Sequence, residues 1–407
     1  MVLPLLAGIR VVDLTKLYSL TTSRLADLGA DVIKVEAPPA GDYLRGLPPF
    51  VGNAGSMAYL TLNRNKRSIG LDLRTDAGRE VLHKLVATAD VVVENSPPNA
   101  QVKLGLDYPT LRQIKPDLVY CSVTAYGQDG PYAPLPSHSM NVDAAAGEIR
   151  IMRGPTGRPE ITAYSTVGHS MELGGLEAAT AITAALVQRG RTGQGQYLDV
   201  AGWDAGLASN QRFLAALNLG SADAAIGAST TGGMGARSNV YGTRDDQVLL
   251  IFPVEKHLWQ RFCAVVERPE WAERGTWSQT MDFGDTDAEA DEALRADIET
   301  VMRTRTLAEW MEAFLAAGVP AAPVSDPDQL PTHPHVHARH MVVTAGDVHY
   351  VRPPVRLPES EFAITIAPPA FGAHTHDVLD GLGFDENARA GLIAAGAVFA
   401  ADDGSQP

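Results

Sequence analysis

The sequence contains little that would bind a nucleic acid, cross a membrane or form disulfide bonds. Its 407 residues include 33 Lys and Arg against 48 Asp and Glu, and no basic stripe offsets the net charge of −15. This balance argues against a nucleic-acid partner and against an anionic membrane surface. No apolar run has membrane-spanning length, and residues 1–6 are too short for a secretory signal. The two distant cysteines, Cys121 and Cys263, form no disulfide framework, so we expect a cytoplasmic protein.

Several familiar site motifs are also absent. Neither a G-x-G-x-x-G fingerprint nor a P-loop follows the first predicted strand, so we expect no nicotinamide or ATP site. The G-x-S-x-G elbow that is typical of serine hydrolases is also missing from the sequence. The histidine-rich segment 333–340 lacks a nearby carboxylate or thiol that would complete a metal site, so we expect an exposed loop and no metal there.

The first half of the sequence contains a repeated strand–helix–strand pattern. Amphipathic helical patterns at 23–28 and 77–88 lie between short apolar runs that are typical of buried strands. Strands joined through helices pair in parallel, which predicts an α/β fold with a doubly wound sheet. The predicted strands are 8–14, 31–36, 91–95 and 118–123.

The second half contains a long Ala-rich helix and a change of composition. The helix is predicted at 174–189, and a strand follows at 197–200. Residues 221–238 are rich in Ala, Ser, Thr and Gly, which is typical of a mobile loop or linker. A second unit is predicted from about 241 to 324, and residues 363–400 are predicted to return to the first domain.

Two segments place a histidine in a small-residue setting before an apolar run. They are 135–141, with His138, and 165–175, with His169. Imidazole changes charge near neutral pH, so either side chain can take and return a proton. A lone loop histidine is nevertheless more often structural, and Glu255 lies where a helix commonly has an N-terminal acid. The basic run 64–68 fits a solvated turn or an anion site equally well.

Nine segments, taken together, resemble the family III CoA-transferases, which include the α-methylacyl-CoA racemases. The resemblance implies a Rossmann-like large domain built from both chain ends, an inserted small α+β domain and an interlocked homodimer. We therefore assign 1–200 and 331–407 to the large domain, 201–240 to a linker helix and Gly-rich loop, and 241–330 to the small domain. The segments are 6–14, 25–36, 41–42, 63–73, 93–95, 104–107, 191–196, 317–324 and 367–379.

The resemblance also implies a coenzyme A thioester as substrate. Family members usually have an arginine after the position of Glu36, and Ala37 stands there in this sequence. Because Arg or Lys neutralises phosphate charge, we expect Arg45 or Lys66 to bind the adenine phosphate instead. The residues at positions that hold the nucleotide or pantetheine in the family are Arg74, Asn95 and Lys103.

The resemblance leaves the reaction open. Transferases of the family use an aspartate, just before the long helix, that forms acyl-anhydride and thioester intermediates. In this sequence that position falls on His169, Ser170 or Met171, none of which is a carboxylate, and Glu172 lies close by. Racemases of the family have a histidine at the position of His138. They also have a glutamate that supports this histidine, and its position corresponds to Glu255 in this sequence.

Three functions follow from these residues. The first is α-proton transfer on an acyl-CoA, by a racemase, epimerase or isomerase, with His138 and Glu255 as one base and His169 or Glu172 opposite. The second is transfer of CoA between carboxylic acids through Glu172. The third is a non-catalytic CoA-binding subunit that pairs with an active homologue.

Overall fold

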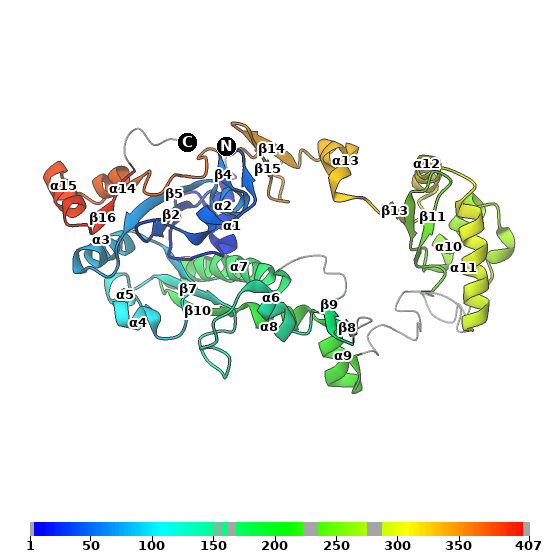
Figure 1. Cartoon of the computed structure of the whole chain (residues 1–407), viewed down its shortest axis with the longest axis horizontal. Coiled ribbons are helices and arrows are strands. Elements are labelled where there is room, and N and C mark those ends of the chain that lie inside the picture. Colours follow the sequence, from blue (N-terminus) through cyan, green and yellow to red (C-terminus); the bar gives the residue numbers. More distant parts are fainter. Residues whose placement is uncertain are drawn as a thin grey trace. The chain divides into compact units, whose positions relative to one another are not determined.

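The protein divides into two compact units. The computed structural model describes residues 4–149, 151–153, 157–161, 168–222, 235–274 and 287–401. The larger unit comprises Met1–Asn210 and His335–Pro407, and the smaller unit comprises Gln211–Pro334 (Figure 1). Residues 202–209, which we expected in a linker, form helix α8 of the larger unit, and most of the expected Gly-rich loop (223–234) lies outside the described residues.

A seven-stranded sheet forms the centre of the larger unit. Its order is β10-β7-β6-β1-β2-β5-β16, and all neighbouring strands are parallel except β16, which pairs antiparallel with β5. The mostly parallel sheet confirms the predicted α/β class. The strands are β1 (Arg10–Asp13), β2 (Asp31–Glu36), β5 (Lys66–Leu71), β6 (Val91–Glu94), β7 (Val119–Thr124), β10 (Gln196–Ala201) and β16 (Val398–Phe399).

The strand order reverses at β1. The chain adds β2 and β5 on one side of β1, and then β6, β7 and β10 on the other side. In open α/β sheets, ligands bind outside the carboxyl ends of the strands at such a reversal. The loops that follow β1 and β6 are therefore the first place to look for a site.

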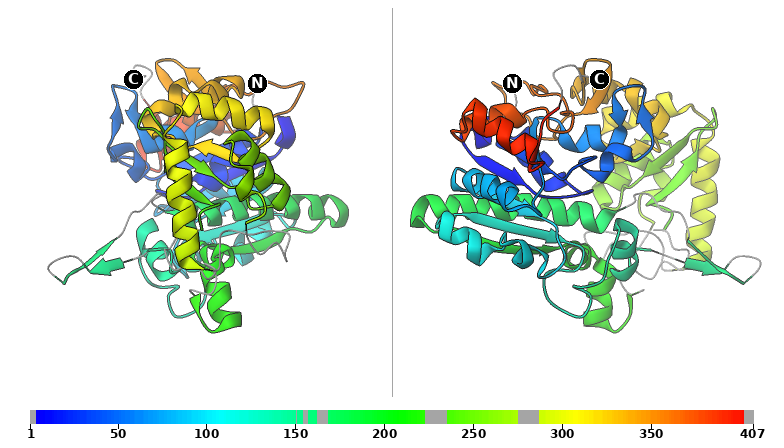
Figure 2. Two further views of the ribbon diagram at one scale, coloured as in Figure 1. Left: turned by 90° about the vertical axis from the view of Figure 1, so that its right-hand side faces the viewer. Right: turned by 60° about the vertical axis from the view of Figure 1, so that its left-hand side comes forward.

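Helices cover both faces of this sheet, as two views show (Figure 2). Neighbouring residues of a strand point to opposite faces. Val11 packs in the cluster that includes α1 (Leu20–Asp27) and α7 (His169–Thr192), whereas Val12 packs in the cluster that includes α3 (Asp76–Ala87), α5 (Tyr108–Ile114) and α14 (Thr375–Gly381). Burial on both faces explains the nearly continuous apolar run of the central strand β6.

Helix α7 begins five residues earlier than its sequence pattern predicts. Gly168, with φ 89°, precedes the first turn, and its backbone N–H donates to the buried Asp143 carboxylate at 2.8 Å. The Ser170 N–H donates to the same carboxylate at 2.9 Å. Asp143 lies in α6 (Ser139–Ala145), so a tertiary contact that no local pattern encodes caps the helix.

Close packing between α7 and α8 (Gly202–Ser209) depends on glycine. A Cβ atom on Gly174 would lie 3.0 Å from the Cα of Gly202, a contact with backbone that cannot easily move. The absence of side chains at these two positions therefore allows the two helices to approach closely.

Further short elements complete the larger unit. The helices are α2 (Met57–Asn63), α4 (Ala100–Leu104) and α15 (Glu386–Ala394), and the hairpins are β3–β4 (Phe50–Val51, Gly55–Ser56), β8–β9 (Ile151–Arg153, Pro159–Ile161) and β14–β15 (Val342–Ala345, Val348–Val351). Part of the histidine-rich segment, expected as a loop, forms the short helix α13 (Pro334–Ala338).

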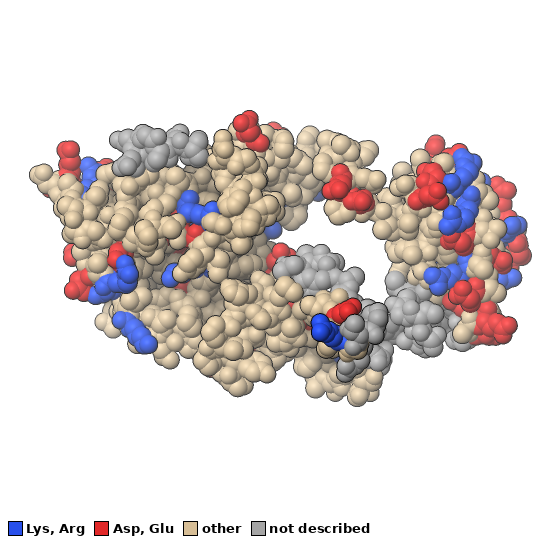
Figure 3. Space-filling view, in the orientation of Figure 1, with Lys and Arg blue, Asp and Glu red and all other residues tan. Residues whose placement is uncertain are grey.

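The smaller unit has an antiparallel sheet and an aromatic core. Its strands are β11 (Asn239–Gly242), β12 (Val248–Ile251) and β13 (Ala321–Pro323), and its helices are α9 (Gln211–Leu219), α10 (Lys256–Val265), α11 (Ala288–Met302) and α12 (Leu307–Ala317). Stacked rings, including Trp259 on Phe262 and Trp310 on Phe314, fill its centre. On the face shown in Figure 3, acidic and basic side chains intermingle over this unit.

Candidate functional site

A cavity of about 570 Å³ lies at the carboxyl ends of β1 and β2. Residues of the two loops that follow these strands line it, including Thr15, Lys16 and the segment 37–43. The loop after β1 is joined to the loop after β6 across the point where the strand order reverses: Lys16 N donates to Asn95 Oδ1 at 2.9 Å, and Asn95 Nδ2 donates to Lys16 O at 2.7 Å. The cavity therefore lies where an α/β sheet binds its ligands.

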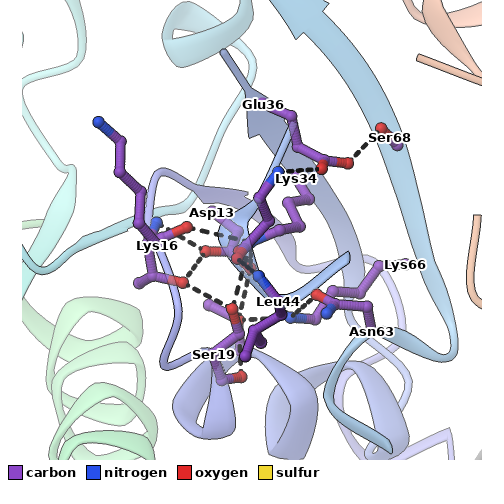
Figure 4. A network of polar contacts seen from close by, with 12 residues as sticks. Asp13, Lys16, Ser19, Lys34, Glu36, Leu44, Asn63, Lys66 and Ser68 are labelled. Carbon is purple, nitrogen blue, oxygen red and sulfur yellow. Dashed lines mark hydrogen bonds and ion pairs between the residues drawn. The ribbon is translucent and has the colours of Figure 1, made fainter. Parts of the chain in front are cut away.

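A buried network of charged and polar side chains supports the wall of this cavity (Figure 4). Asp13, fully buried at the end of β1, accepts hydrogen bonds from Thr15 Oγ1 and Thr22 Oγ1, each at 2.6 Å, and from Lys66 Nζ at 3.0 Å. Burial alone would raise the pKa of Asp13, but Lys34, Lys66 and the two hydroxyl groups lower it below its ordinary value. Asp13 therefore remains a carboxylate inside the protein.

Lys34 joins the two loops that line the cavity. Its Nζ lies 2.8 Å from Asp42 Oδ2 and donates to Thr15 O at 3.0 Å and Ser19 Oγ at 3.2 Å. Burial acts to lower the pKa of Lys34, but the carboxylates of Asp13 and Asp42 raise it above the ordinary value. The charged amine thus links the backbone of the loop after β1 to the Asp42 side chain of the loop after β2.

The structure does not support Lys66 as a ligand of the adenine phosphate, and it places Arg45 in an internal ion pair. Lys66 is fully buried, and its Nζ contacts Asp13, Thr22 and Asn63, so it cannot reach a ligand in the cavity. Arg45 binds Glu36 through two hydrogen bonds of 2.8 and 2.6 Å, and its side chain is 20 % exposed. Sequence reasoning counted these cations as free, because Asp13 is 53 residues from Lys66 and no local spacing rule pairs Arg45 with Glu36, nine residues earlier.

The basic run 64–68 is neither a solvated turn nor an anion site. Each of its cations pairs with a carboxylate from an earlier element of the larger unit. The pairs are Arg64 with Asp27 at 2.6 Å, Lys66 with Asp13 at 3.0 Å and Arg67 with Asp31 at 2.7 Å.

The other residues that we expected to hold CoA lie after β5 and β6. Arg74 follows β5, is 81 % exposed and binds Asp72 through hydrogen bonds of 2.8 and 2.7 Å. Lys103 is an exposed residue of α4, and the Asn95 side chain holds the Lys16 backbone. Their contact with a ligand stays a prediction.

His169 forms a pair with an acid that the sequence did not indicate. Its Nδ1 lies 3.0 Å from Glu148 Oε2, and the His169 side chain is 45 % exposed. A carboxylate at this distance can accept a hydrogen bond from the imidazole and orient the ring. Glu148 precedes His169 by 21 residues, outside any recognised spacing, so only tertiary structure identifies the pair.

Glu172 is the only acidic residue of the segment 169–172, and its side chain is exposed to solvent. Ser170 and Met171 are buried, whereas Glu172 is exposed in the first turn of α7. Burial first, and then the charge of Glu172, raise the pKa of Tyr18, so the phenol stays protonated beside this carboxylate. Among the described residues, the buried Tyr18 hydroxyl has no hydrogen-bond partner.

The segments that carry His138 and His169 meet in the larger unit. Ser139 and Gly168, which adjoin the two histidines, are in contact: a Cβ atom on Gly168 would lie 2.8 Å from Ser139 Cβ. His138 is exposed at the start of α6, and its backbone N–H donates to Asn141 Oδ1 at 3.0 Å. Glu255 belongs to the smaller unit, where it precedes the first turn of α10, so its pairing with His138 stays a prediction.

The described residues also bear on two other kinds of site. They contain no group of three His, Cys, Asp or Glu side chains suited to hold a metal ion. No helix in this part of the chain combines the length and apolar character needed to span a membrane.

Comparison with known proteins agrees with this geometry. Residues 6–375 match the model of CoA-transferase family III. The chain is 33% identical to acetyl-CoA:oxalate CoA-transferase of Acetobacter aceti over 86% of this chain and 88% of that protein. It is 32% identical to succinate–glutarate CoA-transferase of Agrobacterium fabrum over 92% and 95%, respectively. The crystal structure of Rv3272 from M. tuberculosis superposes with a TM-score of 0.77, at 29% identity, over 91% of this chain and 98% of that one. The chain therefore belongs to CoA-transferase family III.

Proposed function

We propose that this protein transfers coenzyme A between two carboxylic acids, with Glu172 as the carboxylate that receives the acyl group. The two curated relatives reported above are named as CoA-transferases, which favours this function over the α-proton transfer that we expected first. The observation that carries the proposal is the exposed Glu172 carboxylate in the first turn of α7, a helix that packs against Tyr18: a Cβ atom on Gly175 would lie 3.3 Å from Tyr18 Cε1. Tyr18 belongs to the loop that also lines the cavity at the carboxyl ends of β1 and β2.

A carboxylate can carry the reaction through two kinds of covalent intermediate. Glu172 attacks the thioester carbonyl, the C–S bond breaks, and a mixed anhydride and the CoA thiolate result. The thiolate then attacks the glutamyl carbonyl, which releases the donor carboxylate and leaves a glutamyl–CoA thioester. The acceptor carboxylate repeats these two steps in reverse order, which forms the new acyl-CoA and restores Glu172.

Transfer assays with three variants test this function. Succinyl-CoA is incubated with a panel of mono- and dicarboxylates, and new acyl-CoA is measured by liquid chromatography and mass spectrometry. We expect Glu172→Gln to lose transfer because an amide is a poor nucleophile, and Glu172→Asp to be impaired because its carboxylate is one methylene shorter. Glu177→Gln, a control at an exposed acid on the next turn of α7, should keep full activity. Full transfer by Glu172→Gln would contradict the proposal.

Proton transfer at the α-carbon is a second candidate function, favoured by one observation. The His169–Glu148 pair, at 3.0 Å, has the composition of an oriented general base, and the segment of His138 contacts its neighbour Gly168. His138, assisted by Glu255, would serve as the opposite base. The third candidate, a non-catalytic subunit, predicts CoA binding without turnover and co-purification with an active homologue.

We propose a homodimer located in the cytoplasm as the working form. The support for the dimer is the family resemblance together with exposed apolar side chains on α7, such as Leu176 and Val187, which a second copy would cover. The support for the cytoplasm is that Cys121 and Cys263 are both buried free thiols. Sedimentation at several concentrations tests the dimer, and a purely monomeric protein would contradict it.

A further inference from the structure

We propose that Lys16 binds a phosphate group of the CoA nucleotide in the cavity at the carboxyl ends of β1 and β2. This inference rests on the proposed function, because it names the part of the same ligand that the larger unit holds. It replaces our earlier expectation that Arg45 or Lys66 performs this role.

Lys16 differs from the other cations that line the cavity, Lys34 and Arg45, in its surroundings. The amine of Lys34 is fully buried against Asp42, and the guanidinium of Arg45 is occupied by Glu36. Lys16 is exposed, and among the described residues its Nζ has no hydrogen bond or ion pair. Figure 4 shows the Lys16 side chain pointing away from the buried network.

The charges around the cavity leave a local positive centre at Lys16. Glu36 and Asp42 also line it, but each is neutralised by its own cation, Arg45 and Lys34, respectively. The charge of Lys16 therefore has no counterpart in the wall. In a chain with a net charge of −15, such a centre is needed to hold a phosphate against the overall field.

The backbone of Lys16 is fixed while its side chain remains available. Both backbone polar atoms bond to the Asn95 side chain, at 2.9 and 2.7 Å. A ligand that engages the amine therefore does not have to order the loop first, which lowers the entropic cost of binding. A lysine amine acts as a compact point charge toward phosphate.

Calorimetric titration with CoA of the wild type and two variants tests the proposal. We expect Lys16→Gln to weaken CoA binding at least about tenfold because the phosphate loses its counter-charge, and Lys16→Arg to retain most of the affinity. Lys115→Gln is the control, because Lys115 precedes the amino end of β7, whereas the cavity lies at the carboxyl ends of the strands. Thermal unfolding of each variant confirms that it is folded.

The choice of ligand separates the phosphate from the rest of CoA. The loss in Lys16→Gln should disappear with acetyl-pantetheine, which lacks the nucleotide. If the loss persists with 3′-dephospho-CoA, Lys16 binds the diphosphate; if it disappears, Lys16 binds the 3′-phosphate. Equal CoA affinity in Lys16→Gln and wild type, or an equal loss toward acetyl-pantetheine, would overturn this inference and leave CoA transfer standing. Failure of the wild type to bind any acyl-CoA would instead contradict the proposed function itself.

Discussion

Asn95 and Lys16 exchange two hydrogen bonds across the point where the order of the sheet reverses. Lys16 N donates to Asn95 Oδ1 at 2.9 Å, and Asn95 Nδ2 donates to Lys16 O at 2.7 Å. The Asn95 side chain thus bonds both backbone polar atoms of Lys16, whose carbonyl also accepts a hydrogen bond from Tyr18 N at 2.7 Å. This pair holds together the loops after β1 and β6, which border the expected CoA site.

The first prediction concerns this pair. Asn95→Ala removes both hydrogen bonds, so we expect it to lower the free energy of unfolding by about 1 to 3 kcal/mol and to weaken CoA binding. Asn95→Asp keeps the acceptor for Lys16 N but loses the donor, so its effects should be smaller. Urea unfolding and calorimetry measure the two quantities. Unchanged CoA affinity in Asn95→Ala would show that the loop does not need this link to bind the ligand.

The second prediction concerns the contact between α7 and α8. Gly174→Ala places a methyl group against the backbone of Gly202, so we expect it to lower the free energy of unfolding by about 1 to 3 kcal/mol. Gly190→Ala is the matched control on the same helix: nothing lies within 4 Å of its Cβ position. There the better helix propensity of Ala should stabilise by about 0.5 to 1 kcal/mol. Equal effects of the two substitutions in urea unfolding would contradict the close contact.

The third prediction concerns pH and Lys66. Burial, with Lys34 adding repulsion, lowers the pKa of Lys66 from 10.5 to about 8 in the folded protein. Between these values the unfolded chain binds a proton that the folded chain has released, so the contribution of Lys66 to stability rises with pH through this window. Lys66→Met removes the contribution. Below about pH 8 Lys66 is protonated in both states and adds no slope.

Urea unfolding of wild type and Lys66→Met across this window checks the sign. We expect the free energy of unfolding of the wild type to increase relative to that of the variant between about pH 8 and pH 10.5. Lys34 does not produce this rise in stability, because its pKa in the folded protein is raised above 10.5. Parallel curves for the two proteins would show that the Lys66 amine is not held in the buried network.

The fourth prediction decides the second candidate function. If the His169–Glu148 pair moves a proton, the wild type incorporates deuterium at C2 of a 2-methylacyl-CoA in heavy water. His169→Gln should then lose about 100-fold or more in exchange rate, and Glu148→Gln should lose less because the imidazole remains. His138→Ala tests the opposite base in the same assay. Absence of exchange in the wild type eliminates proton transfer and leaves CoA transfer.

The fold was largely predictable from sequence, because its determinants are local. Apolar runs and the helices between them predicted β1, β2, β6 and β7 close to their observed bounds. The start of α7 was not predictable, since Asp143 caps it from another helix. A cap that comes from another helix produces no periodic pattern in the sequence around the helix that it caps.

The candidate site was less predictable for the same reason. Sequence reasoning selected Lys66 and Arg45 as free cations, but the structure pairs them with Asp13 and Glu36. It also missed Glu148 as the partner of His169. These pairs form only when the chain folds: Asp13 and Lys66 are 53 residues apart, Glu148 and His169 are 21 apart, and the turn after β2 brings Arg45 back to Glu36.

The most direct test of the account is the location of the covalent intermediate. The enzyme is incubated with an acyl-CoA, the activated carboxyl group is trapped with hydroxylamine, and the peptide that contains residues 169–172 is examined by mass spectrometry. We expect a hydroxamate on Glu172 in the wild type and none in Glu172→Gln. A transferase that turns over while Glu172 remains unmodified, or that is trapped at another residue, would contradict it.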